Sequence, residues 1–394
     1  MKTLQILFSL CGKRSPALLT LVLISIASLG SPVLGIQAQA GVVSAGVPQN
    51  TVITTVTVGE SPNCLVISPD SQTVYVGNSG SNTVSVIDVA NKYTVEATVT
   101  IPNFLNFLAL SVDGKTLYVS ETPSSSGAGV VEVYNVTTPA SPTLTTTLTA
   151  GYYPQGMAVS PDGTTLYVAN GERVFLGRAA SATNARTLQT GTVSVFSTET
   201  NTLIKTIFCK GFPFQLAFTS SGVQLDVLNE AGTGFIQFIT TASKRVSATT
   251  AAGGLIFHPS GMVSNASGTT LYFADGQDYV TVCSAKTGAV KRTFLAVPSI
   301  FNAVFFGQPA LTLDGTYLYL PYAGGGVVKT ADLSMAGPGN SVAMIDVSTG
   351  DIVGSLILVG NNPVWAQVSP DGNTLYVCNR NDGTVSVIDI TPAP

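Results

Sequence analysis

One sequence unit recurs along nearly the whole chain and constrains the fold more than any other feature. Its clearest copy, NPVWAQVSPDGNTLYVCNRNDGTVSVIDI, runs from Asn362 to Ile390 and contains two alternating apolar runs separated by turn residues. A fixed repeat of about 40 to 50 residues is typical of propeller blades or of a solenoid. The Ser-x-Asp-Gly turn aligns seven copies at intervals of 43, 49, 59, 46, 47 and 57 residues. The anchors of the alignment are Asp70, Asp113, Asp162, Ser221, Ser267, Asp314 and Asp371.

Each anchor is followed by two short runs that have the pattern of half-buried β-strands. TLYVAN from Thr165 is an example of the first run, and TVSVID from Thr83 is an example of the second. Both alternate with period two and are rich in β-branched and aromatic residues. A third apolar run precedes each anchor, as at Cys64, and a fourth follows the second run, as at Thr94. Four strands in each of seven units predict an all-β, seven-bladed propeller with four-stranded antiparallel blades.

The two ends of the repeated region predict how the ring closes. The seventh unit stops at Ile390 without a fourth strand, whereas the segment from Asn50 to Gly59 has the pattern of a strand without a unit. We expect residues 51–58 to pair into the last blade as its outermost strand, in the blade that contains Trp365. Such pairing removes the unpaired edges of an open sheet.

The "SPDG…LYV.N…TVSVID" repeat resembles the YVTN-type seven-bladed β-propeller family, which includes YncE-like and surface-layer-associated propellers. The resemblance covers essentially the whole chain after residue 40, and unit four departs from it with Ser221-Gly222 at the turn and Asp226 in place of Tyr. The motif is structural, because Asp and Gly suit a tight turn and Tyr fills the space between blades. The resemblance therefore assigns no catalytic residue, and the anchor aspartates are not expected to be catalytic.

The first forty residues have the pattern of an export signal. Basic residues precede an apolar run from Ala17 to Leu29, and Ala38 to Ala40 form an A-x-A cleavage motif. The apolar run is shorter than the roughly 20 residues that span a membrane. We therefore predict a signal peptide over residues 1–40, a single propeller domain over residues 41–394, a periplasmic or extracellular location, and no transmembrane segment.

The charge of the mature chain speaks against nucleic acid as a partner. Without the leader, 14 basic residues face 21 acidic ones, which gives a formal net charge of −7. Proteins that bind duplexes usually present a basic face, because neutralising phosphates supplies most of the affinity. We expect a monomer whose partner is a protein or a small molecule.

Four cysteines remain after the leader, and each falls in a different repeat. Their spacing matches no zinc motif, and we interpret them as buried apolar side chains in strands. Export would permit disulfides. The pair to test is Cys64 with Cys378, because ring closure makes their repeats neighbours; the other two are Cys209 and Cys283.

Two long insertions lie between the second and third strands of units three and six. They span residues 171–191 and 323–340, and the first contains Arg173 and Arg178. Loops longer than about 12 to 15 residues are usually functional or disordered. Propeller ligands generally use the face on which these loops and the loops between blades emerge, so the insertions either contact a ligand or partner or decorate the fold.

The segments between blades place aromatic residues and amides at one register near the expected channel mouth. Such an arc could hold a small planar or sugar-like ligand between apolar walls and a few orienting polar groups. The alternative is that the rings only cap the blade tips. The candidates for ligand binding are Phe104, Asn106, Tyr153, Gln155, Phe212, Gln215, His258, Trp365 and Arg380.

Two function classes remain open. The first is a non-catalytic binding or protein-interaction module, because the repeat explains the motifs and the chain contains no G-x-S-x-G elbow, phosphate loop or paired-carboxylate signature. The second is a lactonase-like hydrolase of sugar lactones, since similar propellers include lactone hydrolases. In that case His258 or Glu121 would activate water, and Arg173 or Arg178 would hold an anionic substrate. A shared fold alone does not decide between them.

No cofactor or metal is expected. His258 is the single histidine of the chain, which excludes a His-rich metal site. Acidic residues on the expected loop face could bind Ca²⁺ together with neighbouring asparagines, but they are dispersed over different blades. They are Glu60, Glu121, Glu230, Asp275, Asp278 and Asp382.

Overall fold

The computed structural model divides by internal contacts into Met1–Ala38 and Gln39–Pro394, and the described residues belong to the second unit. The export signal predicted for residues 1–40 lies outside the described residues. The structure describes residues 46–124, 128–171, 190–229, 234–251, 260–274, 279–296, 307–323 and 339–393.

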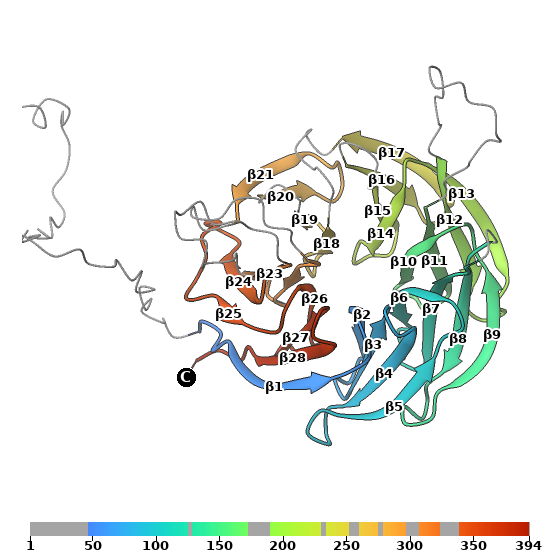
Figure 1. Ribbon diagram of the computed structural model, residues 1–394. Helices are drawn as coiled ribbons and strands as arrows, with labels where there is room; N and C mark the ends of the chain where they lie inside the picture. Colours follow the sequence, from blue (N-terminus) through green and yellow to red (C-terminus); the bar gives the residue numbers. More distant parts are fainter. Residues whose placement is uncertain are drawn as a thin grey trace, which may run out of the picture. The chain divides into compact units, whose positions relative to one another are not determined.

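These residues form seven four-stranded sheets arranged in a ring (Figure 1). The fold is a seven-bladed β-propeller, as the repeat predicts. Blade one contains β2 (Pro62–Ile67), β3 (Thr73–Asn78), β4 (Thr83–Asp88) and β5 (Thr94–Thr100). Blade two contains β6 (Phe104–Leu110), β7 (Thr116–Thr122), β8 (Val130–Asn135) and β9 (Thr143–Thr149). Blade three contains β10 (Pro154–Val159), β11 (Thr165–Asn170), β12 (Thr190–Ser197) and β13 (Leu203–Lys210).

The next three blades repeat the same strand order, and all their neighbouring strands are antiparallel. Blade four contains β14 (Pro213–Phe218), β15 (Gln224–Asn229), β16 (Phe235–Thr240) and β17 (Arg245–Ala251). Blade five contains β18 (Gly261–Ser264), β19 (Thr270–Ala274), β20 (Tyr279–Ser284) and β21 (Val290–Leu295). Blade six contains β22 (Ala310–Leu311), β23 (Tyr317–Tyr322), β24 (Ser341–Asp346) and β25 (Ile357–Leu358).

The seventh blade is built from both ends of the repeated region. It contains β26 (Pro363–Val368), β27 (Thr374–Asn379), β28 (Thr384–Asp389) and, outermost, β1 (Thr51–Thr57). β1 runs antiparallel to β28, with Val56 opposite Val385. The predicted closure of the ring by an N-terminal strand is confirmed.

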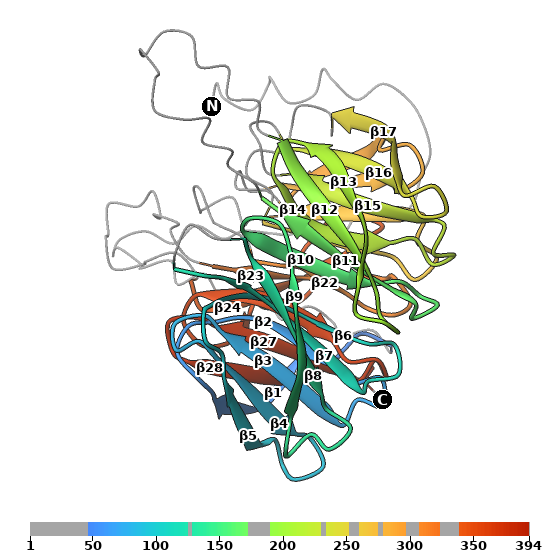
Figure 2. The same cartoon turned by 90° about the vertical axis from the view of Figure 1, so that its right-hand side faces the viewer.

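The propeller has two faces, between which the strands of each blade run (Figure 2). The turns between first and second strands, such as residues 68–73, lie on what we call the turn face. The opposite face, where second strands end and blades connect, is called the loop face; there Asn78 pairs with Pro62. Of the two long insertions expected on this face, residues 172–189 and 324–338 lie outside the described residues.

The repeated turn has a local reason in hydrogen bonding. In blade one the Ser68 hydroxyl donates to Asp70 Oδ1 at 2.5 Å, and the same oxygen accepts the backbone N–H of Gln72 at 3.0 Å. The hydrogen bond from Ser68 holds the pKa of Asp70 below its ordinary value. In blade three the residue after the anchor aspartate is Gly163. Its φ is +73°, a conformation that glycine adopts without strain.

The hydrophobic core lies between blades. The repeated tyrosine of the second strand is buried in it, as at Tyr376, whose cluster also contains Leu65 and Val74 of blade one. A similar cluster joins Tyr118 of blade two to Leu166 of blade three. Each blade therefore buries its apolar side chains against its neighbours, which makes the closed ring the unit of stability.

The irregular unit four forms a regular blade. Asp226, which replaces the repeated tyrosine, lies opposite Ala217 and Phe238 in a continuous ladder. It is buried, and burial raises the pKa of its carboxyl to about 7. Gln224 Nε2 donates to its Oδ1 at 2.6 Å, while Oδ2 has no partner among the described residues.

The four cysteines expected in strands are buried and free in this structure. Burial raises the pKa of the Cys64 thiol to about 12, as expected for an inert side chain. Cys64 and Cys378 are not bonded to each other. Within the described part of the chain, no helix has the length and apolar character needed to span a membrane.

Candidate functional site

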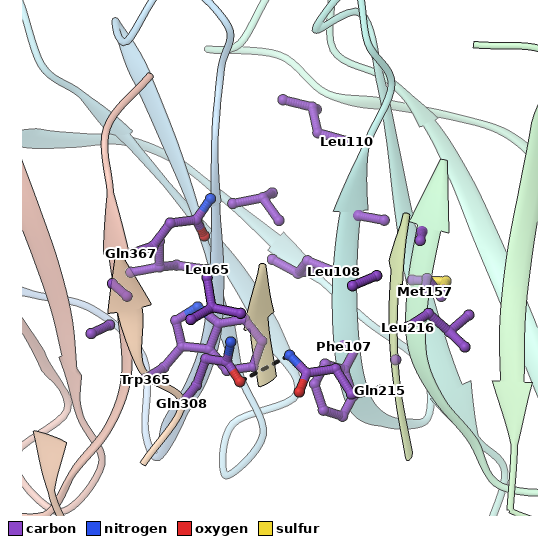
Figure 3. A pocket seen from close by; sticks show the side chains of 18 of the residues that line it. Leu65, Phe107, Leu108, Leu110, Met157, Gln215, Leu216, Gln308, Trp365 and Gln367 are labelled. Atoms are coloured by element: carbon purple, nitrogen blue, oxygen red, sulfur yellow. Dashed lines mark hydrogen bonds between the residues drawn. The ribbon is translucent and has the colours of Figure 1, made fainter. Parts of the chain in front are cut away.

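A central cavity of about 490 Å³ is lined by the innermost strands of the seven blades or by residues directly next to them (Figure 3). Most of the side chains that line it are apolar, and polar atoms also contribute to its exposed wall. Side chains two apart on a strand face the same side, so each innermost strand contributes residues at successive levels. At the middle level most of these residues are small, which leaves the space open. The seven residues of the middle level are Val66, Ala109, Ala158, Ala217, Val263, Ala310 and Gln367.

Four larger side chains lie at one end of the cavity, at the start of the innermost strands and therefore toward the loop face (Figure 3). We call Phe107, Gln215, Gln308 and Trp365 the end layer. The ring of Phe107 meets that of Trp365 edge to face at 5.7 Å, and it meets the ring of Phe214 at the same distance. Edge-to-face pairs at this spacing are favourable.

The two glutamines of the end layer are bonded to each other across blade five. Gln215 Nε2 donates to Gln308 Oε1 at 2.9 Å, and Met262 donates its backbone N–H to Gln215 Oε1 at 2.7 Å. Gln308 Nε2 donates to the carbonyl of Met262 at 2.8 Å. Gly261 makes this possible, because a Cβ there would lie 2.1 Å from Gln308 Oε1. The buried amides are thus satisfied within the protein.

The sequence-predicted residues separate into two groups. Gln215 and Trp365 belong to the end layer, whereas Phe104 and Tyr153 lie on the loop face and are 51% and 47% exposed. Tyr153 has a φ of +49°, a conformation uncommon for an aromatic residue. Phe104 and Tyr153 therefore do not belong to the cavity wall. We call these exposed aromatic residues of the loop face the rim.

The remaining polar candidates are tied into the scaffold or lie at the surface. Asn106 is buried and donates its side-chain N–H to Thr122 Oγ1 at 2.8 Å. The carbonyl of Gln155 accepts the hydroxyl of Ser120 at 3.1 Å. Phe212 is half-buried, and Arg380 is exposed. His258, Arg173 and Arg178 lie outside the described residues.

Sequence reasoning left three cavity residues out of the candidate set, namely Phe107, Gln308 and Gln367. The signal was available in the repeat alignment. Phe107 and Gln308 stand at the same register as Trp365 and Gln215, two residues after the position of the repeated proline. Gln367 is two residues further along β26 than Trp365 and lies on the same side of that strand.

Glu121, a candidate base in the hydrolase interpretation, is completely buried and does not line the cavity. Its Oε2 accepts the backbone and side-chain N–H groups of Asn103 at 3.1 and 3.0 Å. Glu132, opposite Val119 on the neighbouring strand, acts on it through its charge, and Glu121 Oε1 has no hydrogen-bond partner among the described residues. Burial first, and then the charge of Glu132, raise the pKa of Glu121 to about 7.

The acidic residues considered for Ca²⁺ do not converge in the described part of the chain. Among the described residues, no three His, Cys, Asp or Glu side chains gather closely enough to hold a metal. Glu60 is exposed, and Asp382 accepts the backbone N–H of Asn361 at 2.7 Å. Glu230, Asp275 and Asp278 lie outside the described residues.

Three comparisons with known proteins bear on this site. Residues 63–175, which cover blade one, blade two and the start of blade three, match the model of the Choice-of-anchor I domain. A search of curated proteins gave no significant match.

Among solved structures, a chain of Kuenenia stuttgartiensis hydrazine synthase is similar with a TM-score of 0.65. The likeness covers 86% of this chain and 98% of that chain, at 19% sequence identity. The shared feature is the propeller fold. At this identity, and with 1724 solved chains matching, the likeness carries no information on activity.

Proposed function

We propose that this chain is an exported, non-catalytic β-propeller that binds a protein or a small molecule through its loop face. The observation that carries the proposal is the contrast between two sets of aromatic residues. The repeated tyrosines inside the blades, such as Tyr75 and Tyr167, are buried, whereas Phe104, Tyr152 and Tyr153 on the loop face are about half exposed. Exposed aromatic clusters are typical of binding surfaces, because they bury much apolar area at small entropic cost.

Other features support this proposal. Directly behind the rim, the end layer supplies a rigid base of packed rings and bonded amides. The matched domain model is named for an anchor, which agrees with a protein exported by a signal peptide over residues 1–40. The repeat resembles that of YVTN-type propellers, in which the motif is a scaffold, and this supports a role for the loops in recognition.

The proposal is tested with a rim variant that combines Phe104→Ser and Tyr153→Asn, because asparagine tolerates the positive φ at residue 153. Leu203→Ser is the control, since Leu203 is 52% exposed on the outermost strand of blade three, near the turn face. Pull-downs from envelope extract and thermal-shift measurements against a ligand panel use wild type, rim variant and control.

We expect wild type and control to show the same partner or shift, and the rim variant to lose it. Absence of any partner together with absence of any shift contradicts the proposal. Hydrolysis of an aldonolactone by the purified chain, lost in Glu121→Gln, would favour the hydrolase instead.

A further inference from the structure

The central cavity extends away from the loop face to the turn face. Leu110, Phe218, Val368 and Leu313 line its far part, and Leu313 lies in the first turn of blade six with 52% of its side chain exposed. All seven first turns are among the described residues. The turn-face end of the cavity therefore lies entirely among described residues. The end layer lies between this part of the cavity and the aromatic residues of the loop face.

Leu313 is the one first-turn residue that lines the cavity, and the same position of the other first turns is also exposed. The position before each anchor is exposed in all seven turns, and five of the seven residues there are valine, leucine or proline. Val112 is 53% exposed, similar to Leu313. A cavity in which most lining side chains are apolar, with an exposed leucine at its turn-face end, is suited to a molecule with an apolar part. The residues at this position in the other five turns are Pro69, Pro161, Ser220, Ala266 and Pro370.

The same seven turns make the turn face around the cavity acidic on balance. Five of them contain an aspartate and only one, at Lys115, contains a basic residue, within turns that are all described. Hydrogen bonds from the hydroxyls of Ser68, Ser111 and Ser160 lower the pKa of Asp70, Asp113 and Asp162. These carboxylates are ionised at neutral pH, so this face repels anions and attracts cations. The remaining two aspartates are Asp314 and Asp371.

We propose that the central cavity binds an elongated apolar molecule whose polar end is uncharged or positively charged, and that this molecule enters through the turn face. The alkyl part occupies the space between the small residues of the middle level, and the polar end stays among the aspartates. The side-chain amide of Gln367 makes no hydrogen bond within the described residues and is free to bond a polar atom of the ligand. This site goes beyond the loop-face function and is separate from it.

Trp365 provides the readout, because it is the only tryptophan of the chain and lies in the end layer. Decyltrimethylammonium, decanol and decanoate are titrated below their micelle concentrations while tryptophan fluorescence is followed. We expect saturable changes with the cation and the alcohol, and binding of decanoate at least tenfold weaker than that of the cation at low salt. Octyl and nonyl analogues should each weaken binding by about fourfold per methylene removed.

Two sets of variants localise the binding. Ala158→Phe and Ala217→Leu each fill the middle level and should weaken the alkyl cation at least tenfold, with folding checked by far-UV circular dichroism. The triple variant Asp70→Asn, Asp113→Asn, Asp162→Asn keeps the acceptor oxygens of the turns. It should reduce the preference for cation over anion at least fivefold and leave decanol binding unchanged.

Three results would overturn the inference: equal binding of decanoate and the cation by wild type, undiminished binding in both folded cavity variants, or no saturation with any of the probes. Loss of alkyl binding in the rim variant Phe104→Ser, Tyr153→Asn would also contradict it, because the two sites are separate. Retained alkyl binding without a loop-face partner would leave this inference standing and count against the proposed function.

Discussion

Blades one and two have the same backbone register, but at two matched positions blade one has neutral polar side chains and blade two has carboxylic acids. In blade one Asn78 ends the second strand, and its side-chain N–H groups donate to Thr83 Oγ1 and Ser85 Oγ at 3.1 and 3.0 Å. Blade two has Glu121 in place of Asn78 and Glu132 in place of Ser85. Blades three and seven repeat the arrangement of blade one, with Asn170 and Asn379.

The comparison shows that the strand register of a blade does not depend on the identity of this polar pair. Val76 lies opposite Ser85 and Val119 lies opposite Glu132, so the pairing is unchanged when an amide and a hydroxyl become two carboxyls. Two buried carboxylates side by side repel, and the charge of Glu132 adds to the burial that raises the pKa of Glu121. In addition, Tyr134 donates its hydroxyl to Glu132 at 2.5 Å. Blade two thus contains a titratable group where blade one contains a neutral one.

The largest expected effect is a pH dependence of stability that blade two contributes and blade one does not. The pKa of Glu121 is raised from 4.5 to about 7 in the folded state. Below pH 4.5 the carboxyl is protonated in both states; as the pH rises toward 7 only the unfolded chain releases the proton. The free energy of unfolding should then fall by roughly 2 to 3 kcal/mol over this window and become constant above it.

Glu121→Gln removes that loss while keeping an oxygen for Asn103, and urea unfolding between pH 4.5 and 8 measures it. Asp226, whose pKa burial also raises to about 7, adds a second loss of the same sign. The double variant with Asp226→Asn should therefore show the flattest profile. Glu60→Gln, at an exposed carboxylate, is the control; a wild-type profile in Glu121→Gln would refute the assignment.

A smaller effect is expected from breaking the neutral pair of blade one. Asn78→Ala removes the donors to Thr83 and Ser85 and should lower the free energy of unfolding by about 1 to 3 kcal/mol. Because no ionisable group is lost, the decrease should be the same at pH 5 and pH 8. Chemical denaturation at both pH values measures it, and Asn379→Ala in blade seven should behave alike. If the decrease varied with pH, the contrast between a neutral pair in blade one and a titratable pair in blade two would be wrong.

The smallest effect concerns the turn of blade four, which lacks the aspartate of blade one. There the hydroxyls of Thr219 and Ser221 are 3.4 Å apart, a weaker contact than the 2.5 Å bond from Ser68 to Asp70. Ser221→Asp should supply the missing acceptor and stabilise the protein by about 0.5 to 1 kcal/mol. Thermal unfolding measures the gain, and Asp70→Ser should lose a similar amount. Destabilisation by Ser221→Asp would show that the turn of blade four has a different geometry.

The architecture was predictable because it is encoded locally and seven times. Each TVSVID-like run identifies a strand by its alternation alone, and the unpaired strand near Thr51 indicates the closure with β28. The end layer was partly predictable, since Gln215 and Trp365 stand at a common register of the repeat. The bond from Gln215 to Gln308 joins residues 93 positions apart across a whole blade, and no local pattern indicates it. The pair Glu121 and Glu132 required comparison of matched positions between blades, because neither residue forms a motif by itself.

The pairing of β1 with β28 has a consequence for how the molecule reaches its final state. The two strands lie at opposite ends of the repeated region, with Thr51 opposite Asp389. β1 precedes the strands of blades one to six in the chain and β28 follows them, so blade seven is complete only after those blades have been synthesised. Contacts of such long sequence separation are slow to form, because the entropy of closing the chain must be overcome first. The pairing of β1 with β28 is therefore expected to be among the last contacts that the chain forms.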